Sequence, residues 1–361
     1  MEFALSTEQV ELAAAERGWL QKNDPIVERR ESIDDTPARM CAAAREHVVE
    51  SGLAGLLTTD LGGTNVDLLV VVEEHGRAGS AIPIAEWALA ARLLEGVGSP
   101  HHVEVAEGRR LAVPIRPAGT ESFEVTELAN GSLRVRGTST PTTGLADAEC
   151  LVLSAIADDG RVLIAEIPTD DVDVRVLDTL DLLRSWSIVH IDVTVDPGGW
   201  SVAIPGTDAL LADQLAVFRS VDALGAADRL LHLSVEHARQ REQFGRPIGS
   251  FQAVKHHLAN MSLAVEASRA VLWAAAVALD DDGHGTSNRT PGRGRAVSSA
   301  IAYAGTATAA VAQLALQVHG GIGFTWEHDV HLLIRRIKVD ELLDGSVGTH
   351  RDVLVGLHES A

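Results

Sequence analysis

The chain has 361 residues, of which 46% are apolar and only 4% aromatic, and its formal net charge is −21. This composition indicates a globular protein rich in packed helices rather than a disordered chain. The charge disfavours a nucleic-acid backbone or an anionic membrane as the main partner, although a local basic patch could still bind a phosphate-bearing small molecule.

The sequence carries no mark of secretion or of membrane insertion. Cys41 and Cys150 lie far apart and form no metal-binding spacing. The first residues lack the basic and apolar regions of a signal peptide. The longest weakly polar run, 300–316, is interrupted by Gly305 and by threonines, which favours a buried helix over a membrane span. We therefore expect a cytoplasmic protein without a membrane partner.

Residues 1–110 are predicted to form an N-terminal α-helical domain. Ser6-Thr7-Glu8-Gln9 is typical of a capped helix start before an apolar stripe. The apolar runs Leu53–Leu57 and Leu68–Glu74 continue this style. The pair Gly62-Gly63 between them indicates a tight connection.

Residues 111–205 are predicted to form a central β domain. Three segments alternate apolar and polar residues with the period of half-exposed strands: 123–128, 133–136 and 172–176. Asn130-Gly131 lies between the first two and predicts a hairpin turn. Cys150–Ile156 and Val162–Ile167 have the composition of buried strands. Pro197-Gly198-Gly199 is expected to end the β section.

Residues 206–361 are predicted to form a C-terminal helical bundle. Long helical periodicities cover Ala209–Arg241, Val254–Asp280 and Arg295–Val318, and the glycine-rich stretch 280–295 is expected to be a loop. Long helices joined by short loops favour an antiparallel four-helix bundle. The fold class is therefore α+β and mostly α.

Two features of this last region suit an anionic ligand. Arg241 offers a planar fork of donors that matches a pyrophosphate. Gly320 and Gly321 allow a close approach of the backbone to a bulky ligand. Taken alone, each has a simpler interpretation: Arg241 could form a surface ion pair, and the glycine pair could be a turn between helices.

Four segments in order resemble the acyl-CoA dehydrogenase family. Arg241–Gln252 resembles the family's arginine-x-glutamine-phenylalanine-glycine segment and the phenylalanine-glutamine pair after it. Gln317–Phe324 resembles the segment whose glutamine and glycine pair meet the cofactor. Leu343–Arg351 resembles the stretch that holds the catalytic carboxylate, and 61–78 resembles the N-terminal helical signature. Order and spacing hold over nearly the whole chain.

The resemblance implies the acyl-CoA dehydrogenase fold: N-terminal helices, a central β-barrel or sandwich and a C-terminal four-helix bundle. It also implies FAD, held where the β domain of one subunit covers the isoalloxazine and the neighbour's bundle holds the adenine diphosphate part. This chain keeps most of the second set. The cofactor-binding residues implied are Arg241, Gln243, Phe244, Gln252, Gln317, Gly320 and Gly321.

The sequence departs from the family in the half that would cover the flavin ring. The tyrosine-x-x-threonine-glutamate stretch and the tryptophan of the family's β domain have no clear counterpart. Thr142 and Thr143 stand in one of these places and could donate to a flavin edge, as could backbone groups elsewhere. Gly348 stands where the family often has a cofactor-contacting glutamine.

Asp344 stands where many members have the glutamate that removes the acyl α-proton. Aspartate is shorter by about 1.5 Å, and a misplacement of about 1 Å can cost on the order of a hundredfold in rate. An aspartate before Gly345 also suits a helix cap, so base and cap both remain open. The earlier position that some members use falls near Leu215, where there is no glutamate.

This split pattern resembles the smaller subunit of actinobacterial heterotetrameric acyl-CoA dehydrogenases. It implies an FAD-dependent α,β-dehydrogenation of an acyl-CoA thioester, with a second acyl-CoA dehydrogenase-like subunit and an electron-transferring flavoprotein as partners. Steroid side-chain CoA thioesters are a substrate class suggested by analogy. The alternatives are a non-catalytic subunit that completes the partner's FAD site and a flavin monooxygenase of the same fold.

Other chemistries find little support. The pairs His101-His102 and His256-His257 are adjacent and cannot direct both rings from one helix face to a metal, so no metal site is expected. No phosphate-loop motif occurs, and no glycine fingerprint of a dinucleotide-binding unit follows a strand. No serine stands in a nucleophile-elbow context.

Overall fold

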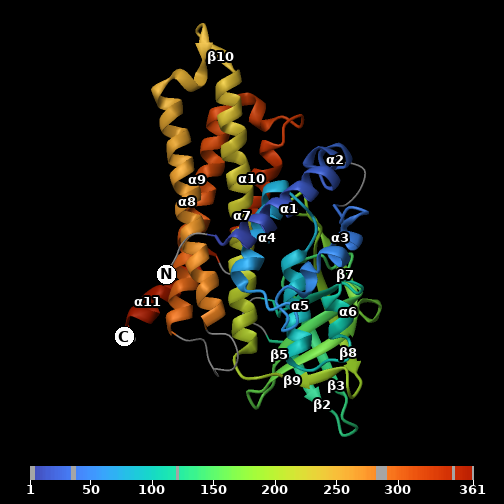
Figure 1. Cartoon of the computed structure of the whole chain (residues 1–361). Coiled ribbons are helices and arrows are strands. Elements are labelled where there is room, and N and C mark those ends of the chain that lie inside the picture. The colour runs from blue at the N-terminus through green and yellow to red at the C-terminus, as the bar shows by residue number, and fades with distance from the viewer. Residues whose placement is uncertain (1–4, 34–37, 119–121, 282–290, 344–345, 360–361) are drawn as a thin grey trace.

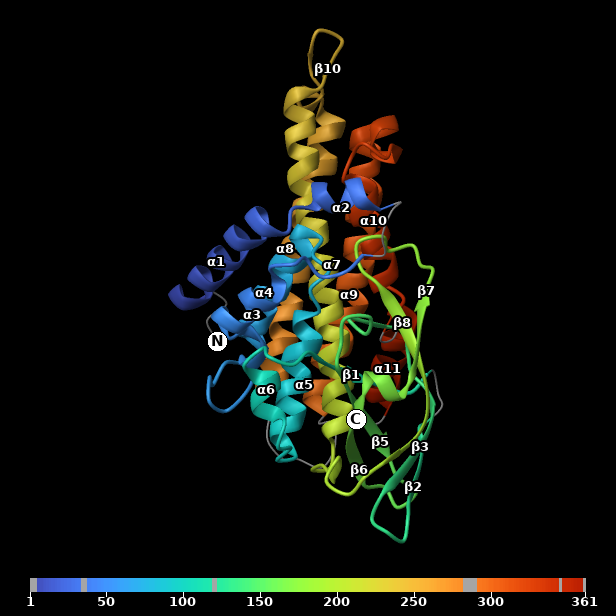
Figure 2. The same ribbon diagram turned by 90° about the vertical axis from the view of Figure 1, so that its right-hand side faces the viewer.

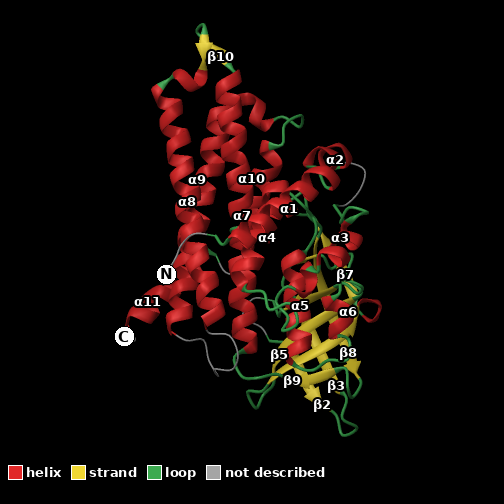
Figure 3. Cartoon of the chain, viewed as in Figure 1, coloured by secondary structure: helices red, strands yellow, loops and turns green. Residues whose placement is uncertain are grey.

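The computed structural model describes residues 5–33, 38–118, 122–281, 291–343 and 346–359. Helices come first, then two β-sheets, then a bundle of long helices (Figures 1 and 3). In both views the sheets lie beside the lower half of the bundle, and the upper half projects beyond them (Figures 1 and 2). The expected fold class, α+β and mostly α, is confirmed.

The first helices begin where the sequence predicted a capped start. Ser6 Oγ accepts from the Gln9 backbone N at 3.2 Å, and Gln9 Oε1 accepts from the Ser6 backbone N at 3.0 Å. Such reciprocal bonds satisfy donors that a helix start leaves open. The helices of this region are α1 (Thr7–Asn23), α2 (Ile26–Ser32), α3 (Ala44–Ser51), η1 (Leu53–Gly55), α4 (Asn65–Ala78), α5 (Ile84–Gly96) and α6 (His102–Ala106).

The β region consists of two sheets. One has the strand order β1 (Ala112–Ile115), β5 (Cys150–Ile156), β6 (Val162–Pro168) and β9 (Trp200–Val202). The other has the order β2 (Glu124–Glu127), β3 (Leu133–Thr138), β8 (Trp186–Val195) and β4 (Thr142–Thr143), and β7 (Asp173–Leu177) also pairs with β8. Only β1 and β5 pair in parallel among these strands.

Most strand predictions hold in this region. Asn130-Gly131 connects β2 to β3, and Gly131 has a φ of +83°, which glycine adopts without strain. The two buried strands lie at 150–156 and 162–168. The expected end of the β section was wrong, because β9 follows Pro197-Gly198-Gly199 and pairs with β6. The turn therefore lies inside the β region.

The C-terminal helices are longer than their periodicity predicted. They are α7 (Thr207–Gln240), α8 (Gln252–Asp281), α9 (Pro291–His319), α10 (Val330–Asp340) and α11 (Val347–Glu359). The predicted loop at 280–295 is shorter than expected, because α9 already begins at Pro291. Within that loop, residues 282–290 lie outside the described residues.

Helices α4 and α7 cross in backbone contact. A Cβ added at Gly76 would lie 2.1 Å from Asp222 O, and one added at Gly225 would lie 2.0 Å from Glu73 O. No side chain fits at such distances, so both positions require glycine. The crossing brings Asp222 of α7 against α4 in the middle of the molecule.

Two helices of the bundle are long and apolar enough to cross a membrane by length and composition alone. They are 252–281, with 33% of its most apolar window buried, and 292–324, with 44% buried. Both pack in the bundle, where α8 and α9 contact each other and α7. Core helices of soluble proteins often meet the same criteria, so the sequence expectation of no membrane partner stays a prediction.

Candidate functional site

The segment around Arg241 forms a hairpin at the tip of the bundle. Helix α7 ends at Gln240, and β10 (Glu242–Gln243) pairs with β11 (Arg246–Pro247). Phe244 in the turn has a φ of +53°, and its side chain is 91% exposed. The hairpin is the highest point of the molecule in Figure 1. It therefore holds Arg241, Gln243 and Phe244 on the surface.

The segment Gln317–Phe324 ends α9 and continues as a 3₁₀ turn, η4 (Gly320–Phe324). Gln317, Gly320 and Gly321 are exposed. A Cβ added at either glycine would meet no atom within 4 Å. Gly320 has a φ of +61° and so favours glycine for its own conformation. Gly321 has neither a positive φ nor a crowded Cβ position, which leaves its surface open to an external group.

A ring stack joins these two segments. The imidazoles of His237 on α7 and His319 on α9 have centroids 4.6 Å apart, and His328 meets His319 edge-on at 5.0 Å. Burial lowers the pKa of His319 to about 4, and its Nδ1 donates to Ala315 O at 2.8 Å. The neutral ring can therefore stack on its neighbours without charge repulsion. The stack holds Arg241 and Gly320 at the same end of the bundle.

The polar side chains at this end are available to a ligand. Arg241, Gln243, Gln252 and Gln317 are exposed, and none forms a side-chain hydrogen bond within the described part of the chain. A guanidinium fork, amide groups and an open glycine backbone suit a diphosphate and its ribose. This end therefore fits the adenosine diphosphate half of FAD.

The region where a flavin edge was expected is occupied by the chain itself. Thr142 and Thr143 form β4 and are both buried. Thr143 Oγ1 donates to Glu86 Oε1 at 2.8 Å, and Thr142 Oγ1 donates to Thr140 O at 3.1 Å. Arg219 Nη2 lies 3.2 Å from the same Glu86 oxygen. Both hydroxyl protons are therefore committed within the protein.

Beside Thr143 lies a buried ion network centred on Asp222. Arg336 Nη2 and Nε donate to the two Asp222 carboxylate oxygens at 2.6 and 2.7 Å. Arg184 Nη1 donates to Asp222 Oδ2 at 3.0 Å and Arg184 Nη2 to Asp340 Oδ1 at 2.7 Å. Every member is buried. The network joins the β region to α7 and α10.

The pKa values of the two aspartates in this network shift in opposite directions. Burial alone would raise the pKa of Asp222, but the guanidinium groups of Arg184 and Arg336 hold it below its ordinary range. Burial raises the pKa of Asp340 well above its ordinary value, against the pull of Arg184 and with the help of Asp222. Of these two carboxyl groups, Asp222 therefore ionises first.

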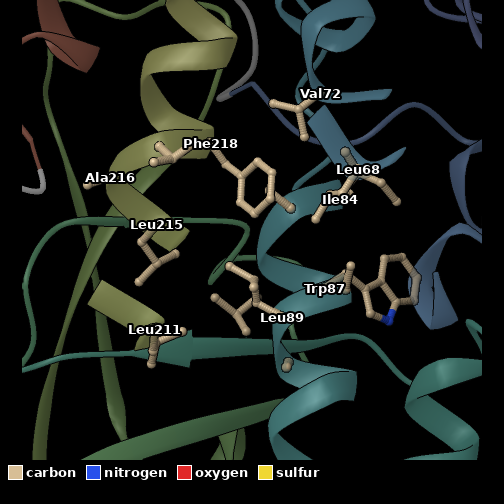
Figure 4. Packing of buried hydrophobic residues seen from close by; sticks show 14 of the residues in the cluster. Leu68, Val72, Ile84, Trp87, Leu89, Leu211, Leu215, Ala216 and Phe218 are labelled. Atoms are coloured by element: carbon tan, nitrogen blue, oxygen red, sulfur yellow. The ribbon is translucent and has the colours of Figure 1, made fainter. Parts of the chain in front are cut away.

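Little space remains between these side chains. The cavity that Glu86, Thr143, Arg184, Arg219, Asp222 and Arg336 line has a volume of about 30 Å³. Pockets for small molecules begin at roughly 300 Å³. Leu215 and Phe218 of α7 also line this cavity, and Figure 4 shows them facing Ile84 and Leu89 of α5. This cavity is therefore too small for an isoalloxazine ring.

Asp344 lies outside the described residues, so its role as base or cap stays a prediction. The network residues Arg184, Arg219, Asp222 and Arg336 were not predicted from the sequence. One sequence signal was available. Arg219 and Asp222 lie three residues apart on α7, and each directly follows one of the buried apolar residues Phe218 and Val221. Within the described ranges, no three His, Cys, Asp or Glu side chains come together in a way that could hold a metal ion.

The fold and the site define a class of protein, and comparison with known proteins agrees. Residues 212–355 match the family described as acyl-CoA dehydrogenase, C-terminal domain. The chain is 34% identical over 278 residues to "Acyl-CoA dehydrogenase IpdE2" of Mycolicibacterium smegmatis, which covers 76% of this chain and 73% of the relative. The chain belongs to the acyl-CoA dehydrogenase family.

Two solved structures have the same fold over nearly the whole chain. The ChsE4-ChsE5 complex from Mycobacterium tuberculosis contains a chain that matches with a TM-score of 0.89 at 24% identity, covering 100% of both chains. A variant of the Tcur3481-Tcur3483 steroid ACAD matches with a TM-score of 0.84 at 23% identity, covering 98% of both chains. At these identities the likeness concerns the fold alone.

Proposed function

We propose that this chain is one subunit of a heteromeric, FAD-dependent acyl-CoA dehydrogenase and supplies the adenosine diphosphate half of a cofactor site that a different chain completes. The complex carries out the α,β-dehydrogenation of an acyl-CoA thioester, and bound FAD takes up the hydride from the substrate. The observation that carries the proposal is the buried Arg184–Asp222–Arg336 network, which fills the space beside Thr143, where the family resemblance places the flavin edge.

A second copy of this chain would not complete the proposed FAD site, because both copies supply the same half of it. The open end of the chain is the exposed end of the bundle that carries Arg241 and Gly320. Two copies of this chain would bring together two open ends and two cavities of about 30 Å³ beside Thr143. No flavin ring would find space in such a pair. A partner with the same fold and an open ring pocket would complete one cofactor site with each copy of this chain.

Exposed apolar side chains surround the open end. Ile322, Phe324 and Trp326 are 46%, 69% and 59% exposed, and Phe244 projects beyond them. A group of large exposed apolar side chains on a folded protein marks an interaction surface. The β domain of the partner subunit is the element that we expect to cover this surface, with FAD between the two chains.

Relatives support the heteromer and its substrate class. Two structural neighbours carry the names of two chains, ChsE4-ChsE5 and Tcur3481-Tcur3483, and the second is called a steroid ACAD. We infer an α2β2 heterotetramer in the cytoplasm that acts on a steroid side-chain CoA thioester. An electron-transferring flavoprotein would reoxidise the flavin, as the family resemblance implies.

The test is co-purification with the acyl-CoA dehydrogenase-like chain encoded beside it. This chain alone should purify without flavin, whereas the complex should be yellow and hold one FAD per pair of unlike subunits. The complex should also form a desaturated thioester. Yellow, active protein from this chain alone would contradict the proposal, and oxygen consumption without a desaturated product would favour a monooxygenase instead.

A further inference from the structure

A second, larger cleft lies where the three regions of the chain meet. Its volume is about 420 Å³, within the range of roughly 300–1,000 Å³ for small-molecule sites. It lies among the loop after η1, the last turns of α5, the start of α7 and the end of α8, and it shares no lining residue with the 30 Å³ cavity. Its apolar lining consists of Leu57, Leu89, Leu93, Val97, Ala203, Ile204, Leu210 and Leu279.

A chain of hydrogen bonds from three helices runs along one wall of this cleft. Gln214 Nε2 of α7 donates to Asn65 Oδ1 of α4 at 2.9 Å. Asn65 Nδ2 and the Asn65 backbone N then donate to Asp280 Oδ1 of α8 at 2.7 and 2.8 Å. All three residues line the cleft. The series of hydrogen bonds therefore runs from Gln214 through Asn65 and ends on the Asp280 carboxylate as its last acceptor.

The polar groups that this wall offers to a ligand are hydrogen-bond acceptors. Apart from Asn65 and the Val66 backbone, no residue in the described ranges donates to Asp280, none donates to Gln214 Oε1, and no basic side chain in those ranges forms an ion pair with Asp280. Burial raises the pKa of Asp280, against the hydrogen bonds that it accepts from Asn65 and from the Val66 backbone. A half-buried carboxylate without a cation is costly. Arg92 also lines the cleft, but it pairs with Glu95 rather than with Asp280.

We propose that this cleft binds a small organic cation, an apolar body that carries a primary ammonium group, with the ammonium donating to Asp280 and Gln214. A primary ammonium has three donors and the charge that the carboxylate lacks. The leucines of α5, α7 and α8 would contact the apolar body. The site is separate from the cofactor halves, so it stands independently of the proposed function.

The test uses three probes with one apolar body: 1-aminoadamantane, 1-adamantanol and adamantane-1-carboxylate. Binding to the full chain, alone and in its complex, is measured by isothermal titration calorimetry, a readout that needs no flavin. We expect the ammonium to bind about tenfold more tightly than the alcohol, because charge-assisted hydrogen bonds are roughly twice as strong as neutral ones. The carboxylate should bind most weakly.

Asp280→Asn provides the decisive variant, because asparagine keeps an oxygen for Asn65 and removes the charge. The preference for the ammonium over the alcohol should disappear, while Asp281→Asn, the matched change at the next residue, should leave it intact. Gly96→Phe fills the cleft where an added Cβ meets no atom within 4 Å, and it should abolish binding of all three probes. Equal affinity of ammonium and alcohol for the unaltered chain, or unchanged binding in Gly96→Phe, would overturn the proposal.

Discussion

The imidazole of His319 stacks on that of His237 with 26° between the ring planes, and this contact joins the ends of α7 and α9. Arg241 follows His237 by one helical turn, and Gly320 follows His319 directly. The two cofactor segments are 65 residues or more apart in the chain (252 to 317), and this ring pair links the helix ends that carry them. The stack therefore aligns one half of the proposed FAD site.

Removing this stack should weaken FAD binding by the complex. For His319→Ala we expect the Kd for FAD to rise about threefold to tenfold, the range that an aromatic contact contributes. His319→Phe keeps a flat ring against His237 and should stay close to the unaltered protein. Fluorescence titration of the complex with FAD measures both, and equal losses in the two variants would contradict a role for stacking.

The same histidine makes the fold sensitive to acid. The pKa of His319 is about 4 in the folded chain because its ring is buried, and it is about 6.5 in an unfolded chain. Between these values the unfolded state binds a proton that the folded state does not. The free energy of unfolding should therefore fall as the pH is lowered from about 6.5 to about 4 and stop falling on this account below that.

Urea unfolding at a series of pH values checks this expectation. In His319→Phe the dependence on pH should be shallower by one proton across that window. His237 and His328 also have a lowered pKa through burial, so part of the dependence should survive. An identical pH profile in the variant would show that His319 does not titrate as described.

Arg241 should matter for cofactor affinity rather than for turnover. Its guanidinium is exposed and is the strongest donor group of the open end. Arg241→Ala should weaken FAD binding by the complex roughly tenfold to hundredfold, as expected for a lost bond to a charged group. The kcat at saturating FAD should not change. Arg239→Ala removes an equal charge two residues away and should change the affinity less than about twofold.

The buried network should be sensitive to the loss of a single charge. Asp222→Asn leaves Arg184 and Arg336 without their shared carboxylate, so the free energy of unfolding should fall by about 3–5 kcal/mol. Asp158→Asn, on an exposed turn, should stay within about 0.5 kcal/mol. Urea unfolding of the two variants gives the comparison, and a small loss for Asp222→Asn would show that the network does not hold the regions together.

Substitution of Asp344 distinguishes a catalytic subunit from a non-catalytic one. A general base contributes about 10²–10⁴-fold to rate, so Asp344→Asn would abolish most turnover if this aspartate removed the α-proton. Because the ring pocket of this chain is closed, we expect turnover by the complex to stay within about twofold. A large loss would assign the base to this chain and contradict the closed-pocket interpretation.

The parts of the fold that were predicted from the sequence are those with a regular local pattern of apolar and polar residues. The period of α7 and the alternation along β2 and β3 reflect contacts that recur every few residues. Arg241 and Gly320 were predicted from short local patterns, and their role in binding FAD stays a prediction. Whether Asp344 acts as a base stays a prediction.

The closed pocket could not be found in this way. The network brings together Arg184, Asp222 and Arg336 from three distant parts of the chain, and no local pattern records that their charges meet. From the sequence alone each residue has the appearance of a solvated surface charge. These residues meet only in the folded chain.

The buried charge network also limits which of its residues can be substituted one at a time during evolution. To reopen the pocket, an arginine and its carboxylate would have to be lost together, because either loss alone leaves a buried ion without a counterion. Each single-step intermediate would be poorly folded. Selection would remove it before the second step occurred. If the proposed function holds, a lineage that acquires Arg184, Asp222 and Arg336 depends on its partner subunit and does not easily return to working alone.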